Sequence, residues 1–168
     1  QMEMHSYEKG KLKTASIVSF ALSPLVKYDE TPESDSLFKV WLNPNKKHLN
    51  KDCQDVELKK EYVAFCAEMI RNILIAFKRI VGNDSWHVYA PKTKQGQLSV
   101  TFMNGILNVI RCQIKDNKQL LTSDEYYEKL KNIDMESLRQ YKSSQTLYCS
   151  LQNNHRHLLC SDAYQIYT

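Results

Sequence analysis

Glycine and proline are scarce in this chain of 168 residues, which contains four of each. Average usage of about 7% glycine and 5% proline would give roughly twenty in all. Sandwiches and barrels need a turn every ~8–12 residues, and their turns consume glycine and proline. The shortage therefore argues against a turn-rich all-β fold. The glycines are also far apart, so the chain contains neither GxGxxG nor GxxxxGK[ST], which excludes two large classes of nucleotide-binding enzyme.

Long apolar runs are missing as well. No segment approaches the roughly 18 uninterrupted apolar residues of a membrane helix, because Glu68 and Arg71 interrupt the most hydrophobic stretch. Five cysteines, an odd number at long spacings, do not form a recognisable disulfide framework. We therefore expect no membrane partner and a reducing, cytoplasmic location. The net charge of +4 is mildly basic, which permits an anionic partner without demanding one.

Apolar periodicity predicts a mainly α fold, a single-domain helical bundle around a long central helix at about residues 55–81. Gly82 is suited to end this helix, and its buried face includes Cys66. A second apolar stripe predicts a helix over 13–28, capped by Thr14 or Ser16, kinked or restarted at Pro24, and buried on most sides.

The remaining segments are predicted from turn formers and shorter stripes. We expect a loop over 29–54 with one helical turn that docks Leu37, Phe38 and Trp41 on the core. A loop over 83–98 precedes a helix over 99–116, with a short β-hairpin or strand near 86–103 as the alternative. Ser123 opens a further helix, and a short one is expected from 135 or 136 to 141. We expect one domain over 1–168, with the weakest signals in 1–10 and 153–168.

The most specific cluster of chemically active side chains is near the C-terminus. Four residues of the kinds that bind zinc lie within twelve positions, namely Cys149, His155, His157 and Cys160. Their spacing matches no standard zinc finger, however, and a polar surface turn explains the same residues. A Cys–His nucleophilic pair would need an orienting group and an oxyanion hole, which nothing in the sequence identifies. We therefore expect a non-enzymatic protein without a cofactor, with zinc at these four residues as the alternative.

Basic residues gather in three places near loops or helix starts, where they could reach phosphates. The candidate nucleic-acid-binding residues are Lys9, Lys11, Lys13, Lys46, Lys47, Lys51, Lys92 and Lys94. Aromatic side chains that could stack bases are Trp86, Tyr89, Tyr148 and Tyr164. An ordinary solvated surface is the alternative for each group.

An ordered set of segments resembles a known family. These segments are KLKTASIVSFALSPLVK (11–27), DSLF (35–38), WLNPNK (41–46), EYVAFC (61–66), TFMNGILN (101–108) and YKSSQ (141–145). In that order they resemble the C-terminal half of bacterial DGQHR-domain proteins, the relatives of DndB, over roughly residues 8–152. Those proteins are associated with DNA phosphorothioate modification and related defence islands.

The resemblance implies a helical accessory module in a DNA-linked protein, acting in DNA binding, regulation or partner docking. The Asp-Gly-Gln-His-Arg signature itself is absent, so no signature residue is carried over. Because the chain begins with Gln1, we expect it to be the C-terminal part of a longer protein, with the N-terminal half as one partner. The alternative is a helical interaction or dimerisation domain that forms a homodimer or docks a protein without touching DNA.

Overall fold

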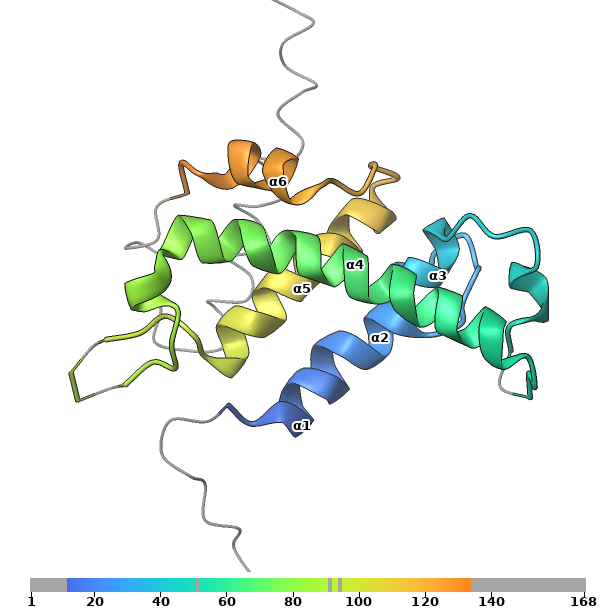
Figure 1. The fold of residues 1–168 in the computed structure, drawn as a ribbon, viewed down its shortest axis with the longest axis horizontal. Helices are drawn as coiled ribbons and strands as arrows, with labels where there is room; N and C mark the ends of the chain where they lie inside the picture. The colour runs from blue at the N-terminus through green and yellow to red at the C-terminus, as the bar shows by residue number, and fades with distance from the viewer. Residues whose placement is uncertain (1–11, 51, 91, 94, 134–168) are drawn as a thin grey trace, which may run out of the picture.

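The computed structural model describes residues 12–50, 52–90, 92–93 and 95–133. Within them the chain is mainly helical, arranged around one long helix, as predicted (Figure 1). Its elements are α1 (Thr14–Ile17), η1 (Val18–Leu22), α2 (Ser23–Val26), α3 (Leu37–Val40), η2 (Lys46–His48), α4 (Val56–Val81), η3 (Asn83–Ser85), α5 (Val100–Lys115) and α6 (Ser123–Leu130).

Helix α4 begins and ends where its sequence predicts. The Asp55 carboxylate accepts a hydrogen bond from the Leu58 amide at 2.9 Å, which satisfies a donor that the first turn leaves free. At the other end, Gly82 adopts a φ of 81° and donates its N–H to the carbonyl of Lys78. Glycine adopts a positive φ with less steric strain than any other residue, so the helix ends at this position.

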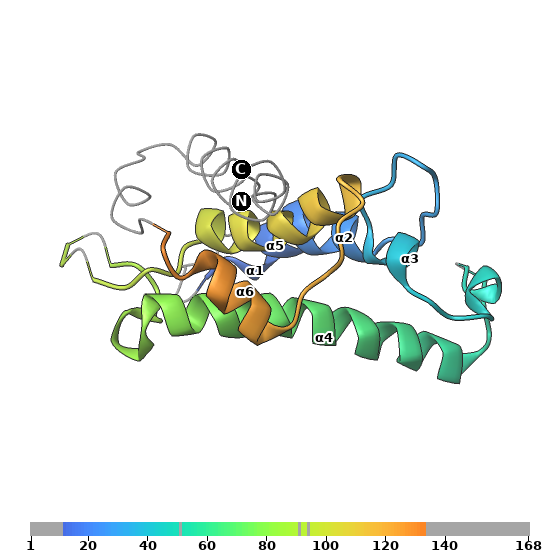
Figure 2. The same cartoon turned by 90° about the horizontal axis from the view of Figure 1, so that it is seen from above.

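The other long helices pack against α4 on one side only. In Figure 2, α4 runs along one side of the molecule, and α5 with α1–α2 runs along the opposite side. Helix α6 lies over α4, where the Arg79 guanidinium sits 3.9 Å from the Tyr127 ring centroid. The core between these helices includes Phe77 and Phe102, whose rings meet edge to face at 5.9 Å. Cys66 is buried, as predicted, and Cys53 and Cys112 are buried as well.

The first helical segment differs from its prediction in two respects. Neither Thr14 nor Ser16 caps it, because Lys13 occupies the N-cap position without a side-chain cap bond. The segment is also not buried on most sides, since Val18 is 47% and Phe20 70% exposed. Its middle turn, η1, is a π turn, which moves Phe20 away from the apolar face.

The predicted helix over 99–116 is confirmed as α5 (Val100–Lys115), and the alternative of a strand over 98–103 is wrong. The Ser99 hydroxyl accepts from the Phe102 amide at 3.1 Å and starts α5 at Val100. The other alternative was a β-hairpin near 86–103. In place of paired strands, the described residues of 86–98 form two isolated β-bridges, Val88 with Leu98 and Ala90 with Gln95.

The hydroxyl of Thr122, one residue before Ser123, caps α6 together with Glu125. The helix expected at 135–141 lies outside the described residues. Within them, no helix has both the length and the hydropathy that a membrane crossing requires.

Candidate functional site

Those of the predicted lysines that the structure describes do not form one basic patch. Lys46 and Lys47 lie in η2, before α4 begins, and Lys92 lies in the loop that follows η3, after α4 has ended. With 26 residues at about 1.5 Å each, α4 separates the two ends by roughly 40 Å. Figures 1 and 2 both place η2 and this loop at opposite ends of the molecule. Lys13 is exposed just before α1. Lys9, Lys11, Lys51 and Lys94 lie outside the described residues.

The candidate metal ligands Cys149, His155, His157 and Cys160 also lie outside the described residues. Among the residues that are described, no group of three or more His, Cys, Asp or Glu side chains could hold a metal ion. Of the predicted stacking aromatics, Tyr89 is 41% exposed, and Trp86 is half-buried against the core. Tyr148 and Tyr164 are outside the description.

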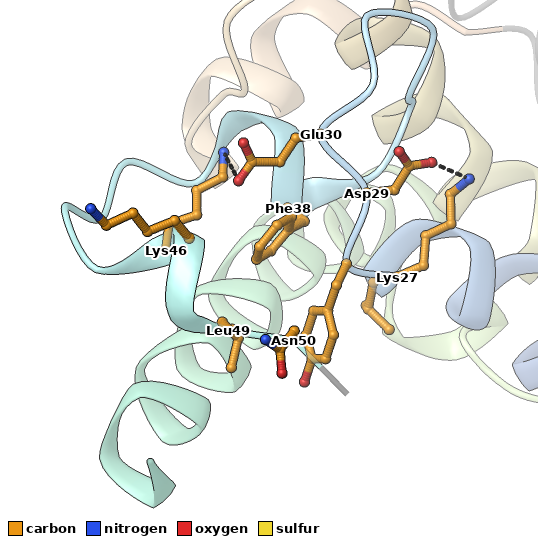
Figure 3. A pocket seen from close by; sticks show the side chains of 10 residues that line it. Lys27, Asp29, Glu30, Phe38, Lys46, Leu49 and Asn50 are labelled. Atoms are coloured by element: carbon orange, nitrogen blue, oxygen red, sulfur yellow. Dashed lines mark ion pairs between the residues drawn. The ribbon is translucent and has the colours of Figure 1, made fainter. Parts of the chain in front are cut away.

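Lys46 and Lys47 do line a pocket of about 840 Å³, shown in Figure 3. We call it the Phe38 pocket. One wall comes from the end of α2 and the loop after it, and the other comes from η2 and the two residues after it. The lining residues are Val26, Lys27, Tyr28, Asp29, Glu30, Phe38, Lys46, Lys47, Leu49 and Asn50. They include no histidine, cysteine or serine.

Aromatic rings form the base of the Phe38 pocket. The Phe38 ring is 5.4 Å from the Tyr28 ring and 5.4 Å from the Tyr62 ring, the second pair meeting edge to face. The Tyr62 hydroxyl donates to the carbonyl of Val26 at 3.1 Å, which fixes the end of α2 over α4. Burial raises the pKa of Tyr62 well above its ordinary value, so the phenol stays neutral and serves packing. Tyr28 remains 42% exposed and offers part of its ring to a ligand.

Two of the three lysines at the pocket already have anionic or carbonyl partners. The Lys46 ammonium donates to the carbonyl of Lys39 at 3.1 Å, lies 3.6 Å from the Glu30 carboxylate, and sits 5.1 Å from the Phe38 ring centroid. Lys27 pairs with Asp29 at 2.7 Å. Lys47 is exposed and has no ion pair with another described residue. Among the described residues, the rim therefore presents paired charges and one lysine, Lys47, without an ion pair.

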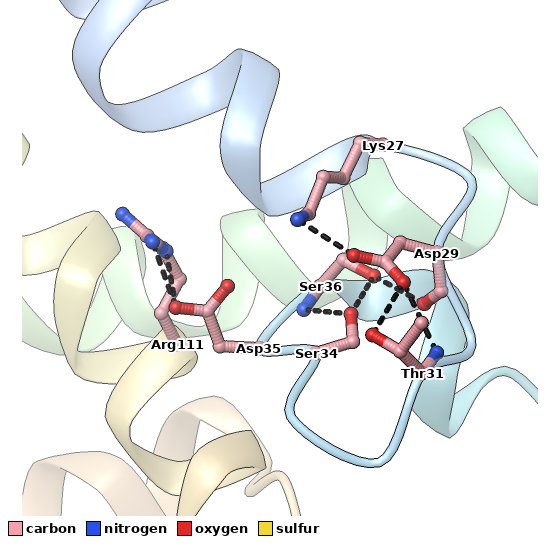
Figure 4. Close-up of polar contacts among 7 residues, drawn as sticks. All are labelled: Lys27, Asp29, Thr31, Ser34, Asp35, Ser36 and Arg111. Atoms are coloured by element: carbon pink, nitrogen blue, oxygen red, sulfur yellow. Dashed lines mark hydrogen bonds and ion pairs between the residues drawn. The ribbon is translucent and has the colours of Figure 1, made fainter.

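The wall after α2 is held by a small network of polar contacts, drawn in Figure 4. Asp29 accepts hydrogen bonds from the amide and hydroxyl of Thr31 at 3.0 and 2.8 Å. The Lys27 hydrogen bond, followed by those from Thr31, holds the pKa of Asp29 far below its usual range. The buried Ser36 hydroxyl donates to the carbonyl of Asp29 at 3.0 Å. These contacts fix the loop conformation without regular secondary structure.

Among the described residues, one ion pair connects this loop to α5. Arg111 donates from Nε and Nη2 to one carboxylate oxygen of Asp35, at 3.0 and 2.7 Å. The two side chains are each 22% exposed, so water screens the pair only in part. The pair therefore joins the segment that carries the pocket wall to the body of the bundle.

Several residues at the pocket carried no functional signal in the sequence. Asp29 and Asn50 counted only as turn formers, Tyr28 counted as part of a helical stripe, and Glu30 was not singled out. Arg111, which lies outside the pocket and pairs with Asp35, was not singled out either. The usable signal was the dense set of turn formers around the Leu37–Phe38 patch, since such loops often carry binding residues. Asp124 and Glu125 are the acidic residues of the first turn of α6, where Glu125 completes the capping box with Thr122.

Comparison of the chain with protein-family models, with curated proteins and with solved structures found no match. The resemblance to DGQHR-domain proteins therefore stays a prediction.

Proposed function

We propose that this chain is a non-catalytic helical interaction module that holds a segment of a partner protein in the Phe38 pocket. The lining of the pocket carries this proposal. Tyr28, Phe38 and Leu49 offer apolar contact, and aromatic and leucine side chains are common anchors in such hollows. Lys47 is the lysine without an ion pair among the described residues of the rim, so an acidic residue next to the anchor suits the site. The proposed ligand is an acidic peptide with one aromatic or leucine anchor.

The distribution of charge favours a peptide over a nucleic-acid backbone at this pocket. Affinity for DNA comes largely from cations that neutralise phosphates. At the Phe38 pocket, Lys27 and Lys46 are already paired with Asp29 and Glu30, so they contribute little toward neutralising a row of phosphates, whereas a peptide with one acidic side chain needs a single cation. Lys92 lies at the far end of the molecule. Among the described residues, a nucleic-acid backbone crossing the pocket would therefore meet one lysine without an ion pair, which is too few for strong binding.

The resemblance to DGQHR-domain proteins supports a place for this module in a DNA-linked protein. In that setting the partner segment belongs to another component of the DNA-modification system or to the N-terminal half that the resemblance implies. Direct DNA contact is the second candidate. It is favoured by Tyr28, whose ring is partly exposed, and by the exposed Lys47, which line the same pocket and could stack a base and hold a phosphate.

A selected peptide tests the proposal. A phage-displayed library of random twelve-residue peptides is panned on the full chain, and enriched peptides are synthesised and titrated by calorimetry. We expect an aromatic or leucine residue beside Asp or Glu, and at least tenfold weaker binding to the Tyr28→Ser and Lys47→Glu variants. Tyr89→Ser and Lys92→Glu are the matched controls, since Tyr89 is 41% exposed against 42% for Tyr28 and lies at the opposite end.

Two results would overturn the proposal. One is enrichment of peptides whose affinity is the same for Tyr28→Ser and for the Tyr89→Ser control. The other is the absence of any enriched peptide, together with DNA binding that falls steeply between about 50 and 200 mM salt and is lost in Lys47→Glu. That second pattern would transfer the function to direct DNA contact.

A further inference from the structure

The outer face of α4 carries a charge pattern that is symmetric in position and opposite in sign about Ala64. Lys60 and Glu68 lie four residues before and after Ala64, and Glu57 and Arg71 lie seven residues before and after it. All five side chains are exposed. We call these five residues the Ala64 stripe.

The Ala64 stripe is the outermost line of the helix. At about 100° per residue, its members lie within roughly 40° of a line through Ala64. The buried side chains of Tyr62 and Ile73 lie on the opposite side, toward the core. Figure 2 agrees, because the other described helices lie on one side of α4 and the opposite side forms an edge of the molecule.

We propose that the Ala64 stripe docks on the same stripe of a second copy of this chain, with the two α4 helices antiparallel and a twofold axis at Ala64. Such an axis brings Lys60 opposite Glu68 of the second copy, and Glu57 opposite its Arg71. At about 1.5 Å per residue these pairs lie roughly 6 and 10 Å from the axis. Twofold symmetry makes each pair occur twice.

The same charges exclude the other simple arrangement. Two parallel helices in register would place Lys60 against Lys60 and Glu68 against Glu68, and like charges across a seam repel. Within one copy, Lys60 is paired with Glu57 at 2.8 Å, in a contact whose side chains are 66% and 77% exposed. Glu68 and Arg71 have no ion pair with another described residue. The antiparallel pair gives both of them partners.

Exposed apolar residues flank the stripe along one shoulder. Val56 is 60% and Val63 64% exposed, and Ala67 is exposed between the two ends of the stripe. The proposed twofold axis is perpendicular to the plane of the two helices. It therefore places these flanking apolar residues on the same side of the helix–helix contact in both copies. The valines of both copies therefore lie along the same side of the contact, and the small Ala64 at the centre lets the helices approach closely. The Phe38 pocket takes no part in this contact.

Charge exchange tests the dimer without disturbing the fold, since every changed side chain is exposed. The full chain is studied by sedimentation velocity over about 1–500 μM as wild type, Lys60→Glu, Glu68→Lys and the double exchange. We expect a dimer in the wild type, a dissociation constant at least tenfold higher in each single variant, and recovery to within about threefold of wild type in the double variant. Lys78→Glu is the matched control, because Lys78 is exposed on α4 but its opposite position in the second copy precedes the helix.

A monomeric wild type over this range would overturn the dimer. So would single variants that dimerise like the Lys78→Glu control, or a double exchange that is no better than the single ones. Circular dichroism melts confirm that each variant is folded. Peptide binding at the Phe38 pocket is measured separately, so either idea can fail alone.

Discussion

Removing the ion pair between Asp35 and Arg111 should cost more stability than removing an ordinary surface pair. Two N–H groups of Arg111 donate to one oxygen of Asp35, at 3.0 and 2.7 Å, and each side chain is 22% exposed. Hydrogen bonds to charged groups contribute about 1.5–3 kcal/mol, whereas fully exposed ion pairs contribute about 0.2–1 kcal/mol. Because water still reaches this pair, we expect a coupling energy of about 1–2 kcal/mol.

A double-mutant cycle measures that coupling. The free energy of unfolding in urea is determined for wild type, Asp35→Ala, Arg111→Ala and the double variant. The control cycle uses Glu128 and Lys131, an exposed pair on neighbouring turns with 63% and 43% side-chain exposure, for which we expect about 0.2–0.5 kcal/mol.

A coupling at Asp35–Arg111 no larger than the control would refute the reasoning, since it would mean that partial burial adds nothing to the pair. The same conclusion would follow if raising the salt concentration removed the coupling as completely as it does in the control. A surviving coupling at high salt is the expected outcome.

Three further predictions concern the interior. Tyr126→Phe should lower the free energy of unfolding, measured in urea, by about 1–3 kcal/mol, because the buried Tyr126 hydroxyl donates to Gln113 and its loss leaves that acceptor unpaired. A decrease of less than about 0.5 kcal/mol would contradict this. Stability should fall as pH rises from about 9 to about 11, because burial raises the pKa of Cys66 to about 11 and the unfolded chain loses that proton first; an identical decline in Cys66→Ala would contradict this. In thermal melts, Leu25→Ala should lower the free energy of unfolding by about 2–5 kcal/mol and Phe20→Ser by less than about 0.5 kcal/mol. A decrease at Phe20 as large as that at Leu25 would contradict the 70% exposure of Phe20.

The long helices could be predicted because their signals are local. Asp55 and Gly82 mark the two ends of α4, and the apolar stripe between them repeats with the helical period. The strand over 98–103 was a wrong alternative for a related reason. Leu98, Val100 and Phe102 do alternate, yet Ser99 is a helix cap, and a cap bond together with a long apolar stripe outweighs three alternating residues.

The pocket could not be predicted, because it depends on contacts between distant parts of the chain. Lys46 was a candidate for phosphate binding as one member of a basic cluster. In the fold its ammonium meets the carbonyl of Lys39, the ring of Phe38 and the carboxylate of Glu30. A count of lysines along the sequence contains none of these partners, so it overstates how many cations are free for an anionic ligand.

The first helical segment shows how one residue can change which side chains are buried. Pro24 has no amide hydrogen and its ring clashes with the preceding turn of a regular α-helix. The segment accommodates it with the π turn Val18–Leu22, in which the Ser23 amide bonds to the carbonyl of Val18, five residues back. The wider turn brings Ala21 and Leu25 onto the core, where they are 2% and 0% exposed, and it rotates Phe20 outward. A regular helical period would group Phe20 with Ala21 on the apolar face, so the turn that accommodates Pro24 also affects which face of the segment is exposed.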